Sequence, residues 1–327
     1  MDVLDDYLAR VRAHGAVFCS TVSVPPWGLR FTEPAPLALV ALPRGTAWIV
    51  PDDGPPAELR QGDIALVRTR QPYTVADRPE STPQVLVDGA DHCTMVGGPH
   101  EQGHNWRTAG RTIGHPADST TDLLITAGYR IGGQLSRPLL DMLPPVAVVR
   151  PEHPAGAQPP PGPAALLSLV TAEIERDAPG QQVILDRYLD LLLVQTLRSW
   201  FDRPDTPAPT GYRALADPDI GHVLRRVHED PARPWTVGSL AQEAGMSRTT
   251  FARRFSALVG LPPLTYVTQW RMALAADRLR APGATVAAVA RSVGYTDGFA
   301  FSAAFKRVQG ISPSAHRAGP PPSDTIL

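Results

Sequence analysis

Short apolar runs separated by Pro, Gly and Asp dominate residues 1–150, after one stretch with helical spacing at residues 2–12. Such runs, four to eight residues long and bounded by turn formers, are typical of β-strands. Gly45 and Gly62 stand where hairpin turns are expected. Many short strands with turn signals predict a β-sandwich or barrel, preceded by a short amphipathic helix. The expected strands cover residues 16–23, 37–42, 47–50, 63–68, 84–87, 123–126 and 146–149.

Residues 151–212 differ in composition from the residues before them, because two proline-rich stretches enclose a strongly apolar segment. Residues 151–163 and 203–212 have the composition of linkers, and proline makes such linkers extended and partly stiff. Between them, residues 164–202 predict two helices, over 164–177 and 181–202. Their apolar surface is too large for one face of an isolated helix pair. It therefore packs on the sandwich, on another subunit, or on both.

The segment 213–317 contains one local pattern twice. The two copies lie 49 residues apart up to a turn glycine and 50 residues apart after it. Each copy predicts a helix, a tight turn and a second helix, and a run without Gly or Pro at 264–280 predicts a helical spacer. The paired positions are Ala241 and Ala290, Gly245 and Gly294, Ser247 and Asp297, Phe251 and Phe301, Phe255 and Phe305, Gly260 and Gly310, and Pro263 and Pro313.

Charge separates the same segment from the rest of the chain. The net charge is only −1, but residues 213–317 hold 14 Arg or Lys and 7 Asp or Glu, a balance of +7 that leaves −8 elsewhere. A basic helical module beside an acidic remainder is the electrostatic pattern of nucleic-acid binding. Two cysteines argue against a secreted disulfide scaffold. The acidic start without a signal-peptide core, and the absence of a membrane-length apolar run, predict a soluble cytoplasmic protein.

The duplicated segment resembles the DNA-binding domain of the AraC/XylS family of transcriptional regulators. The residues that carry this resemblance are Trp235-Thr236-Val237, Leu240-Ala241, Gly245-Met246-Ser247, Phe251, Phe255, Gly260, Pro263, Tyr266, Trp270-Arg271-Met272, Ala275, Leu279, Val289-Ala290, Gly294-Tyr295, Phe301, Phe305-Lys306, Gly310, Ser312-Pro313 and Arg317. The resemblance implies two recognition helices, over about 247–256 and 297–307, that enter successive major-groove faces of double-stranded DNA.

By alignment of these motifs, the base-facing positions of the family fall on two sets of residues. We expect the basic face to add Arg248, Arg254 and Lys306. Our hypothesis is that Arg253 reads a guanine, whereas the second helix, poor in donors, makes thymine-methyl or backbone contacts. The two aligned sets are Thr249, Ala252 and Arg253, and Gly298, Phe299, Ser302 and Ala303.

Residues 1–150 resemble the cupin-type sensor domain that often precedes such DNA-binding domains. The motif residues are Pro26-Trp27-Gly28-Leu29-Arg30, Arg44-Gly45, Trp48, Gly62-Asp63-Ile64-Ala65-Leu66-Val67, Gly128-Tyr129 and Leu139-Leu140. Enzymatic cupins carry metal-binding histidines where this chain has Leu39, Val40 and Ala41, then Gln71, Pro72 and Tyr73. We therefore expect no conventional cupin metal site, and a sensor rather than an enzyme. Trp27, Arg30, Trp48 and Tyr73 are candidates to line an effector site, and equally candidates for core or rim positions.

Two further features lie outside the cupin pattern. Cys19 and Cys93 are a candidate redox pair, with His92 beside Cys93, although two inert buried thiols are an equally simple interpretation. The loop 88–122 concentrates ligand-type residues that could bind zinc or copper, or could be solvated. These candidate metal ligands are His92, Cys93, His100, His104 and His115.

These observations together predict an α+β multidomain protein. It has a cupin-like β-barrel or sandwich at 1–150, a helical dimerisation pair at 164–202 and an all-α double helix-turn-helix at 213–317, followed by a disordered tail at 318–327. The predicted function is sequence-specific transcriptional regulation by a homodimer that responds to a signal, such as a small-molecule effector. The alternatives are an oxidant-responsive regulator that switches through Cys19 and Cys93, and a cupin enzyme fused to a DNA-binding domain. Neither the cofactor nor the effector can be named from the sequence.

Overall fold

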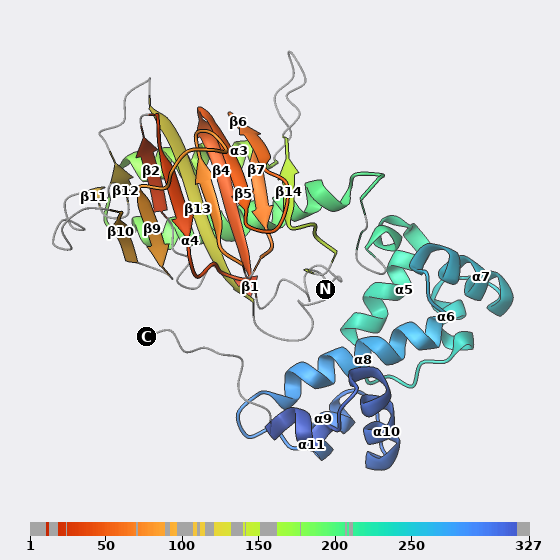
Figure 1. Cartoon of the computed structure of the whole chain (residues 1–327). Coiled ribbons are helices and arrows are strands. Elements are labelled where there is room, and N and C mark those ends of the chain that lie inside the picture. The colour runs from red at the N-terminus through yellow and green to blue at the C-terminus, as the bar shows by residue number, and fades with distance from the viewer. Residues whose placement is uncertain are drawn as a thin grey trace. The chain divides into compact units, whose positions relative to one another are not determined.

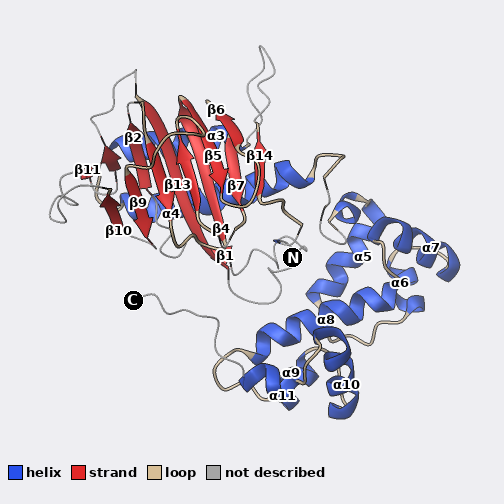
Figure 2. Cartoon of the chain, in the orientation of Figure 1, coloured by secondary structure: helices blue, strands red, loops and turns tan. Residues whose placement is uncertain are grey.

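The computed structural model divides the chain into two compact units, one built from strands and one from helices (Figure 1, Figure 2). The first contains residues Val11–Ile131 and Leu143–Thr206, and the second contains Pro207–Leu327. The structure describes residues 11–12, 19–23, 25–69, 71–88, 92–96, 107–109, 112–114, 121–131, 140, 142–150, 162–176, 178–206, 208 and 212–318.

Two sheets form the strand-built unit. The larger has the order β11-β12-β2-β13-β4-β7-β14, with β1 also paired to β13, and the smaller has the order β10-β9-β3-β8-β5-β6. Most neighbours are antiparallel, whereas β12 with β2 and β3 with β9 are parallel. The strands are β1 Val11–Arg12, β2 Cys19–Ser23, β3 Gly28–Phe31, β4 Leu37–Arg44, β5 Thr46–Pro51, β6 Ala57–Arg60, β7 Ile64–Val67, β8 Tyr73–Ala76, β9 Val85–Asp88, β10 His92–Met95, β11 Arg107–Ala109, β12 Thr112–Gly114, β13 Asp122–Ile131 and β14 Val146–Val149.

The first six residues of the strand β4 are all apolar and buried because both faces of the strand are covered there. Val40 and Leu42 point into the core between the two sheets, together with Ile49 and Val75 from the smaller sheet. Leu39, next to Val40, points to the opposite face and is also completely buried. A strand buried on both sides loses the alternation of apolar and polar residues that marks a half-exposed strand.

The second face of the larger sheet is covered by two helices, α3 (Pro163–Arg176) and α4 (Gln181–Phe201) (Figure 1). Tyr129 on β13 is fully buried, and its hydroxyl donates to the carbonyl oxygen of Leu189 on α4 at 2.8 Å. Burial, with the negative charge of Asp190 added, raises the pKa of Tyr129, so this hydroxyl stays protonated. The predicted helix pair therefore packs on the sandwich within one chain, and the ends of both helices agree closely with the sequence prediction.

Two expectations for this unit were wrong. Val11 and Arg12 do not end a helix, because they form β1 and pair with Ile131 and Arg130 of β13. The remainder of that predicted helix lies outside the described residues. Gly45, between β4 and β5, does adopt the left-handed backbone (φ 98°) expected of a turn. It makes no hairpin, however, because β4 and β5 belong to different sheets, and the turn carries the chain around a corner of the sandwich. Gly62 (φ 87°) makes no hairpin for the same reason, because β6 belongs to the smaller sheet and β7 to the larger.

In its described residues, the helical unit contains the short 3-10 helix η2 (Arg213–Ala216) and seven α-helices, which are shown as helices in Figure 2. They surround two separate apolar cores that share the helix α8. Tyr266 and Trp270, on the first half of α8, belong to the first core, whereas Met272 and Leu279 on its second half belong to the second. The helices are α5 Pro218–Glu229, α6 Val237–Glu243, α7 Arg248–Val259, α8 Pro263–Leu279, α9 Val286–Ser292, α10 Gly298–Gln309 and α11 Pro313–Ala318.

Within the described residues, no helix combines the length and the apolar character that crossing a membrane requires.

Candidate nucleic-acid interface

The sequence duplication is a structural duplication. The helices α6 and α9 are seven residues long, and α7 and α10 are twelve residues long, so each short helix is followed by a longer one in the same order. Thr236 begins α6 with a reciprocal capping box, in which Ser239 N donates to Thr236 Oγ1 (3.0 Å) and Thr236 N donates to Ser239 Oγ (2.9 Å). Thr285 caps α9 without a reciprocal bond, because its side chain accepts from Ala288 N at 3.2 Å and the alanine side chain has no acceptor to return the bond.

A left-handed glycine makes the turn in each copy. Gly245 has φ 63° and Gly294 has φ 85°, a conformation that other residues adopt only with strain. The next helix then starts at a side-chain cap. Ser247 accepts from Thr250 N at 3.3 Å, and Asp297 accepts from Phe299 N at 2.9 Å and from Ala300 N.

Paired phenylalanines hold the second helix of each copy in its core. The rings of Phe251 and Phe255 lie 5.4 Å apart with an interplanar angle of 50°. Those of Phe301 and Phe305 lie 5.7 Å apart at 46°. All four side chains are at least 99% buried. Since residues four apart share one helix face, the opposite faces of α7 and α10 are left to solvent.

The outward face of α7 is polar and basic. Arg248, Thr249 and Arg253 are exposed and Ala252 is half-buried, so the three aligned base-facing positions do share one face. The guanidinium of Arg248 also lies over α6, because a Cβ on Gly238 would be 3.0 Å from Arg248 Nε. This face offers hydrogen-bond donors suited to guanine and to phosphate oxygens.

The outward face of α10 has a different chemistry. Phe299 is 89% exposed, the largest fraction among the exposed large hydrophobic residues in the described part of the chain. Gly298 and Ala303 are also exposed, while the hydroxyl of Ser302 donates to the carbonyl oxygen of Gly298 at 2.8 Å. The donors that remain are Lys306 and Arg307, one to two turns further along the helix. The start of α10 is therefore suited to apolar contact.

Arg254 belongs to the fold of the unit. Its guanidinium bonds Asp217 Oδ2 at 2.8 Å and Asp219 Oδ2 at 3.0 Å, at the start of α5. Asp217 is itself the N-cap of α5, accepting from Asp219 N and Ile220 N. The predicted DNA contact of Arg254 thus competes with two carboxylates, which the sequence could not place because they lie 35 and 37 residues away.

The four candidates for an effector site lie on the smaller sheet but not on one of its faces. Trp27 and Tyr73 belong to the core between the sheets. There, Trp27 Nε1 donates to Asp122 Oδ2 at 2.7 Å, and Tyr73 stacks on Phe31 at 4.7 Å. Arg30 and Trp48 alternate with core residues and therefore face away from that core. Arg30 forms a two-bond ion pair with Asp52, at 2.5 and 2.6 Å.

The candidate thiols and metal ligands are described only in part. Cys19 lies on β2 of the larger sheet and Cys93 on β10 of the smaller, so their backbones belong to different sheets. His92 also lies on β10, whereas His100, His104 and His115 lie outside the described residues. Among the described residues, no three side chains of His, Cys, Asp or Glu come together as a metal-binding group.

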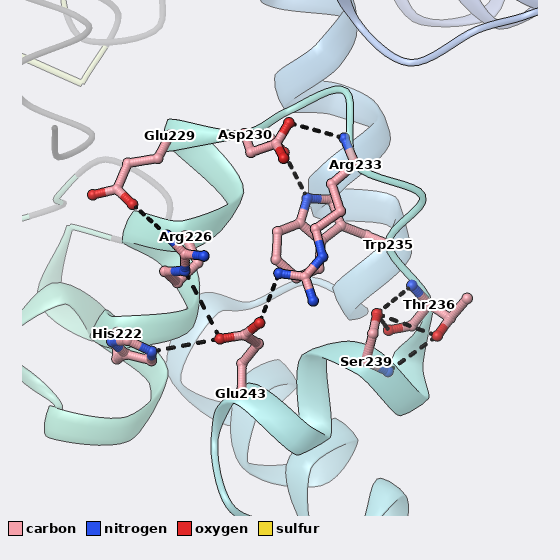
Figure 3. Close-up of polar contacts among 9 residues, drawn as sticks. All are labelled: His222, Arg226, Glu229, Asp230, Arg233, Trp235, Thr236, Ser239 and Glu243. Atoms are coloured by element: carbon pink, nitrogen blue, oxygen red, sulfur yellow. Dashed lines mark hydrogen bonds and ion pairs between the residues drawn. The ribbon is translucent and has the colours of Figure 1, made fainter.

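The loop before α6 contains a polar network that the sequence did not predict (Figure 3). Glu243 on α6 pairs with Arg233 of the loop at 2.7 Å and with Arg226 and His222 of α5 at 3.8 and 3.7 Å. These partners, Arg233 first, lower the pKa of Glu243 although burial opposes them. The guanidinium of Arg233 lies 4.3 Å above the ring of Trp235, whose Nε1 donates to Asp230 O. The loop is thus fixed to both neighbouring helices.

The fold and this interface define a class, namely proteins that present two helix-turn-helix units to DNA beside a cupin-type domain. The Cupin family matches residues 2–202, and the Helix-turn-helix domain family matches residues 240–319. A putative AraC-like transcription regulator of Streptomyces lividans is 34% identical over 321 residues, covering 98% of this chain and 99% of that protein. The chain therefore belongs to the AraC family of DNA-binding transcriptional regulators.

The comparisons found two further similarities. A putative AraC-like transcription regulator of Streptomyces antibioticus is 33% identical over 325 residues, covering 98% of this chain and 100% of that protein. Among solved structures, the DNA-binding domain of the global transcriptional factor AdpA, in complex with a target DNA, is 34% identical. That match covers 31% of this chain and 90% of the AdpA chain, with a TM-score of 0.30.

Proposed function

We propose that α7 and α10 are the base-contacting helices of this regulator and that they read DNA by different chemistry. The observation that carries the proposal is the contrast between the two outward faces. Arg253 in the middle of α7 is an exposed charged donor, whereas Phe299 in the first turn of α10 is an exposed aromatic ring. Arg253 suits the two acceptors of guanine in the major groove, and Phe299 suits the methyl group of thymine.

The remaining exposed residues would contact the DNA backbone. Arg248 and Lys306 supply donors beside the base-facing positions, and such phosphate contacts set register and orientation without reading sequence. Arg254 is not in this set, because Nη1 and Nη2 of its guanidinium donate hydrogen bonds to Asp219 and Asp217.

The test is selection of binding duplexes from a random pool by the full chain, followed by competition with variants. Arg253→Ala should relax the preference for guanine at one position and cost roughly 1–3 kcal/mol in binding. Lys306→Ala should weaken all duplexes about equally and reduce the salt dependence of binding. The proposal fails if Arg253→Ala leaves the base preference of the chain unchanged.

We further propose that the strand-built unit is a sensor without catalytic activity, that the protein acts in the cytoplasm where the DNA is, and that it binds DNA as a homodimer. The support for a homodimer is on α3 and α4. Nine of their apolar side chains are buried, but four large ones are exposed: Leu169, Val183, Ile184 and Leu191. A signal sensed by the first unit would act by shifting the population of DNA-binding states. Sedimentation of Leu191→Glu against the parent chain tests the dimer.

A further inference from the structure

Arg271 lies at the boundary between the two cores of the helical unit. It follows Trp270, the last buried residue of α8 in the first core, and precedes Met272, the first buried residue of α8 in the second core. Its side chain is only partly exposed. The contacts of its guanidinium explain why it lies there.

The guanidinium of Arg271 donates hydrogen bonds to the loop before α6, which leads into the first helix-turn-helix. Nε donates to the carbonyl oxygen of Pro231 at 2.7 Å, and Nη2 donates to the carbonyl oxygen of Arg233 at 2.7 Å. Two bonds from a planar fork fix direction as well as distance, which a lysine cannot reproduce. The loop itself is fixed to α5 and α6 by Arg233 and Glu243 (Figure 3).

The same guanidinium reaches the turn of the second helix-turn-helix. It lies 5.9 Å from the ring centre of Tyr295, which contacts Phe301 of α10 edge to face at 5.7 Å. Gly294 comes even closer to the loop before α6, because a Cβ there would lie 2.6 Å from the carbonyl oxygen of Ala232 and 3.0 Å from Arg271 Nη2. The turn of one copy therefore rests directly on the loop of the other.

The duplicated glycine shows that this contact is not a general requirement of the turn. Gly245 occupies the equivalent place in the first copy and also has a positive φ, of 63°, but nothing lies within 4 Å of a Cβ there. Both glycines are needed for backbone conformation, whereas Gly294 alone is needed for close approach between copies.

We propose that Arg271 and Gly294 form a positioning clamp that fixes the second helix-turn-helix against the first, so that α7 and α10 accept only one spacing of their target bases. This inference rests on the proposed function. A rigid connection holds the second recognition helix at the groove once the first has bound, which raises its effective concentration. A loosened connection lowers that concentration and tolerates more spacings.

The experiment uses the full chain and the duplex that it selects from a random pool. The α7 half of this duplex is the set of base pairs at which Arg253→Ala alters preference. Binding is measured on the full duplex, on the isolated α7 half, and on duplexes with one base pair inserted or removed between the halves. Arg271→Ala and Arg271→Lys are the variants, with thermal unfolding as the check on folding.

The matched control is Arg278→Ala. Arg278 is also on α8 and also makes two hydrogen bonds, at 2.9 and 2.8 Å, but both go to Ser292 within the second copy. Both Arg271 variants should weaken the full duplex by about tenfold or more, change the α7 half by less than about twofold, and flatten the spacing profile. Arg278→Ala should leave the profile as sharp as in the parent chain.

A glycine pair gives a second test that does not depend on Arg271. Gly294→Ala and Gly245→Ala carry similar backbone strain, but only the former places a methyl group against Ala232. Only Gly294→Ala should alter the spacing profile. Two results would overturn the clamp and leave the proposed function standing. One is an equal loss of affinity for the full duplex and for the α7 half; the other is a spacing profile in Arg271→Ala and Gly294→Ala that is as sharp as in the parent chain. If the parent chain enriches no duplex, the proposed function falls as well.

Discussion

The exposed ring of Phe299 makes the most specific prediction about how this protein reads DNA. A phenylalanine side chain presents on the order of 150–250 Å² of surface, and 89% of Phe299 is exposed. Covering about half of it in a groove would contribute roughly 2–3 kcal/mol at about 25 cal/mol per Å². Phe299→Ala should therefore weaken binding to the selected duplex by about thirtyfold to a hundredfold.

The thymine methyl can be removed separately by replacing thymine with uracil. Burial of one such group is worth about 0.8 kcal/mol, so a single dT→dU change under Phe299 should cost about fourfold in affinity. The assay is a competition titration in which each thymine of the duplex is replaced in turn, with the parent chain and with Phe299→Ala.

The two changes should not be additive. The penalty for uracil should be present at one or more thymines with the parent chain and absent at the same positions with Phe299→Ala. Thr249→Ala, at the equivalent position of α7, is the control and should leave the uracil penalty intact. A penalty of equal size in Phe299→Ala, or no penalty at any thymine, would refute the assignment.

Four further predictions concern the stability of the helical unit. Thr236→Ala removes the capping box of α6 and should cost about 1 kcal/mol in the free energy of unfolding, measured with urea. Arg254→Ala should lower the melting temperature while leaving base preference intact, because it loses Asp217 and Asp219 and not DNA; a changed preference would contradict this. Burial lowers the pKa of His228 from 6.5 to about 3, so the unfolded chain binds the extra proton. Stability should fall by roughly 1.4 kcal/mol for each pH unit below about pH 6.5, and His228→Phe should abolish that slope. The pKa of Glu243 is lowered in the folded chain, chiefly by Arg233. Its contribution to the free energy of unfolding is therefore present above the ordinary pKa of 4.5 and is lost as the pH falls through the pKa of the folded state. Glu243→Gln should reduce this loss of stability at acidic pH.

Local signals in the sequence predicted α6 to α10 closely, because these helices begin and end with residues that act on their own neighbours, whereas η2, α5 and α11 were not predicted. Thr236, Asp297 and Gly310 cap helices through contacts within a few residues. The duplication also predicted the turn glycines Gly245 and Gly294 at equivalent positions of the two copies. Such features depend on short-range geometry, and the sequence displays them directly.

Features that depend on distant partners were not visible in the sequence. Gly45 was correctly expected to turn the chain, but the choice of sheet for β4 and β5 depends on strands elsewhere in the chain. The alternation of side chains along a strand places Arg30 and Trp27 on opposite sides, yet only the structure shows which side faces the core. The acceptors of Arg271 are backbone carbonyl oxygens, which have no sequence signature at all.

The central claim is that α7 and α10 read one duplex together. The 17 residues of α8 between them span roughly 25 Å, a length suited to adjacent major-groove faces about 34 Å apart. The most direct measurement is a chemical-protection footprint of the full chain on its selected duplex. Two protected major-groove segments on one face, about one helical turn apart, are the predicted result, with Phe299→Ala losing one segment and Arg253→Ala weakening the other. A single protected segment, or none, would contradict the claim.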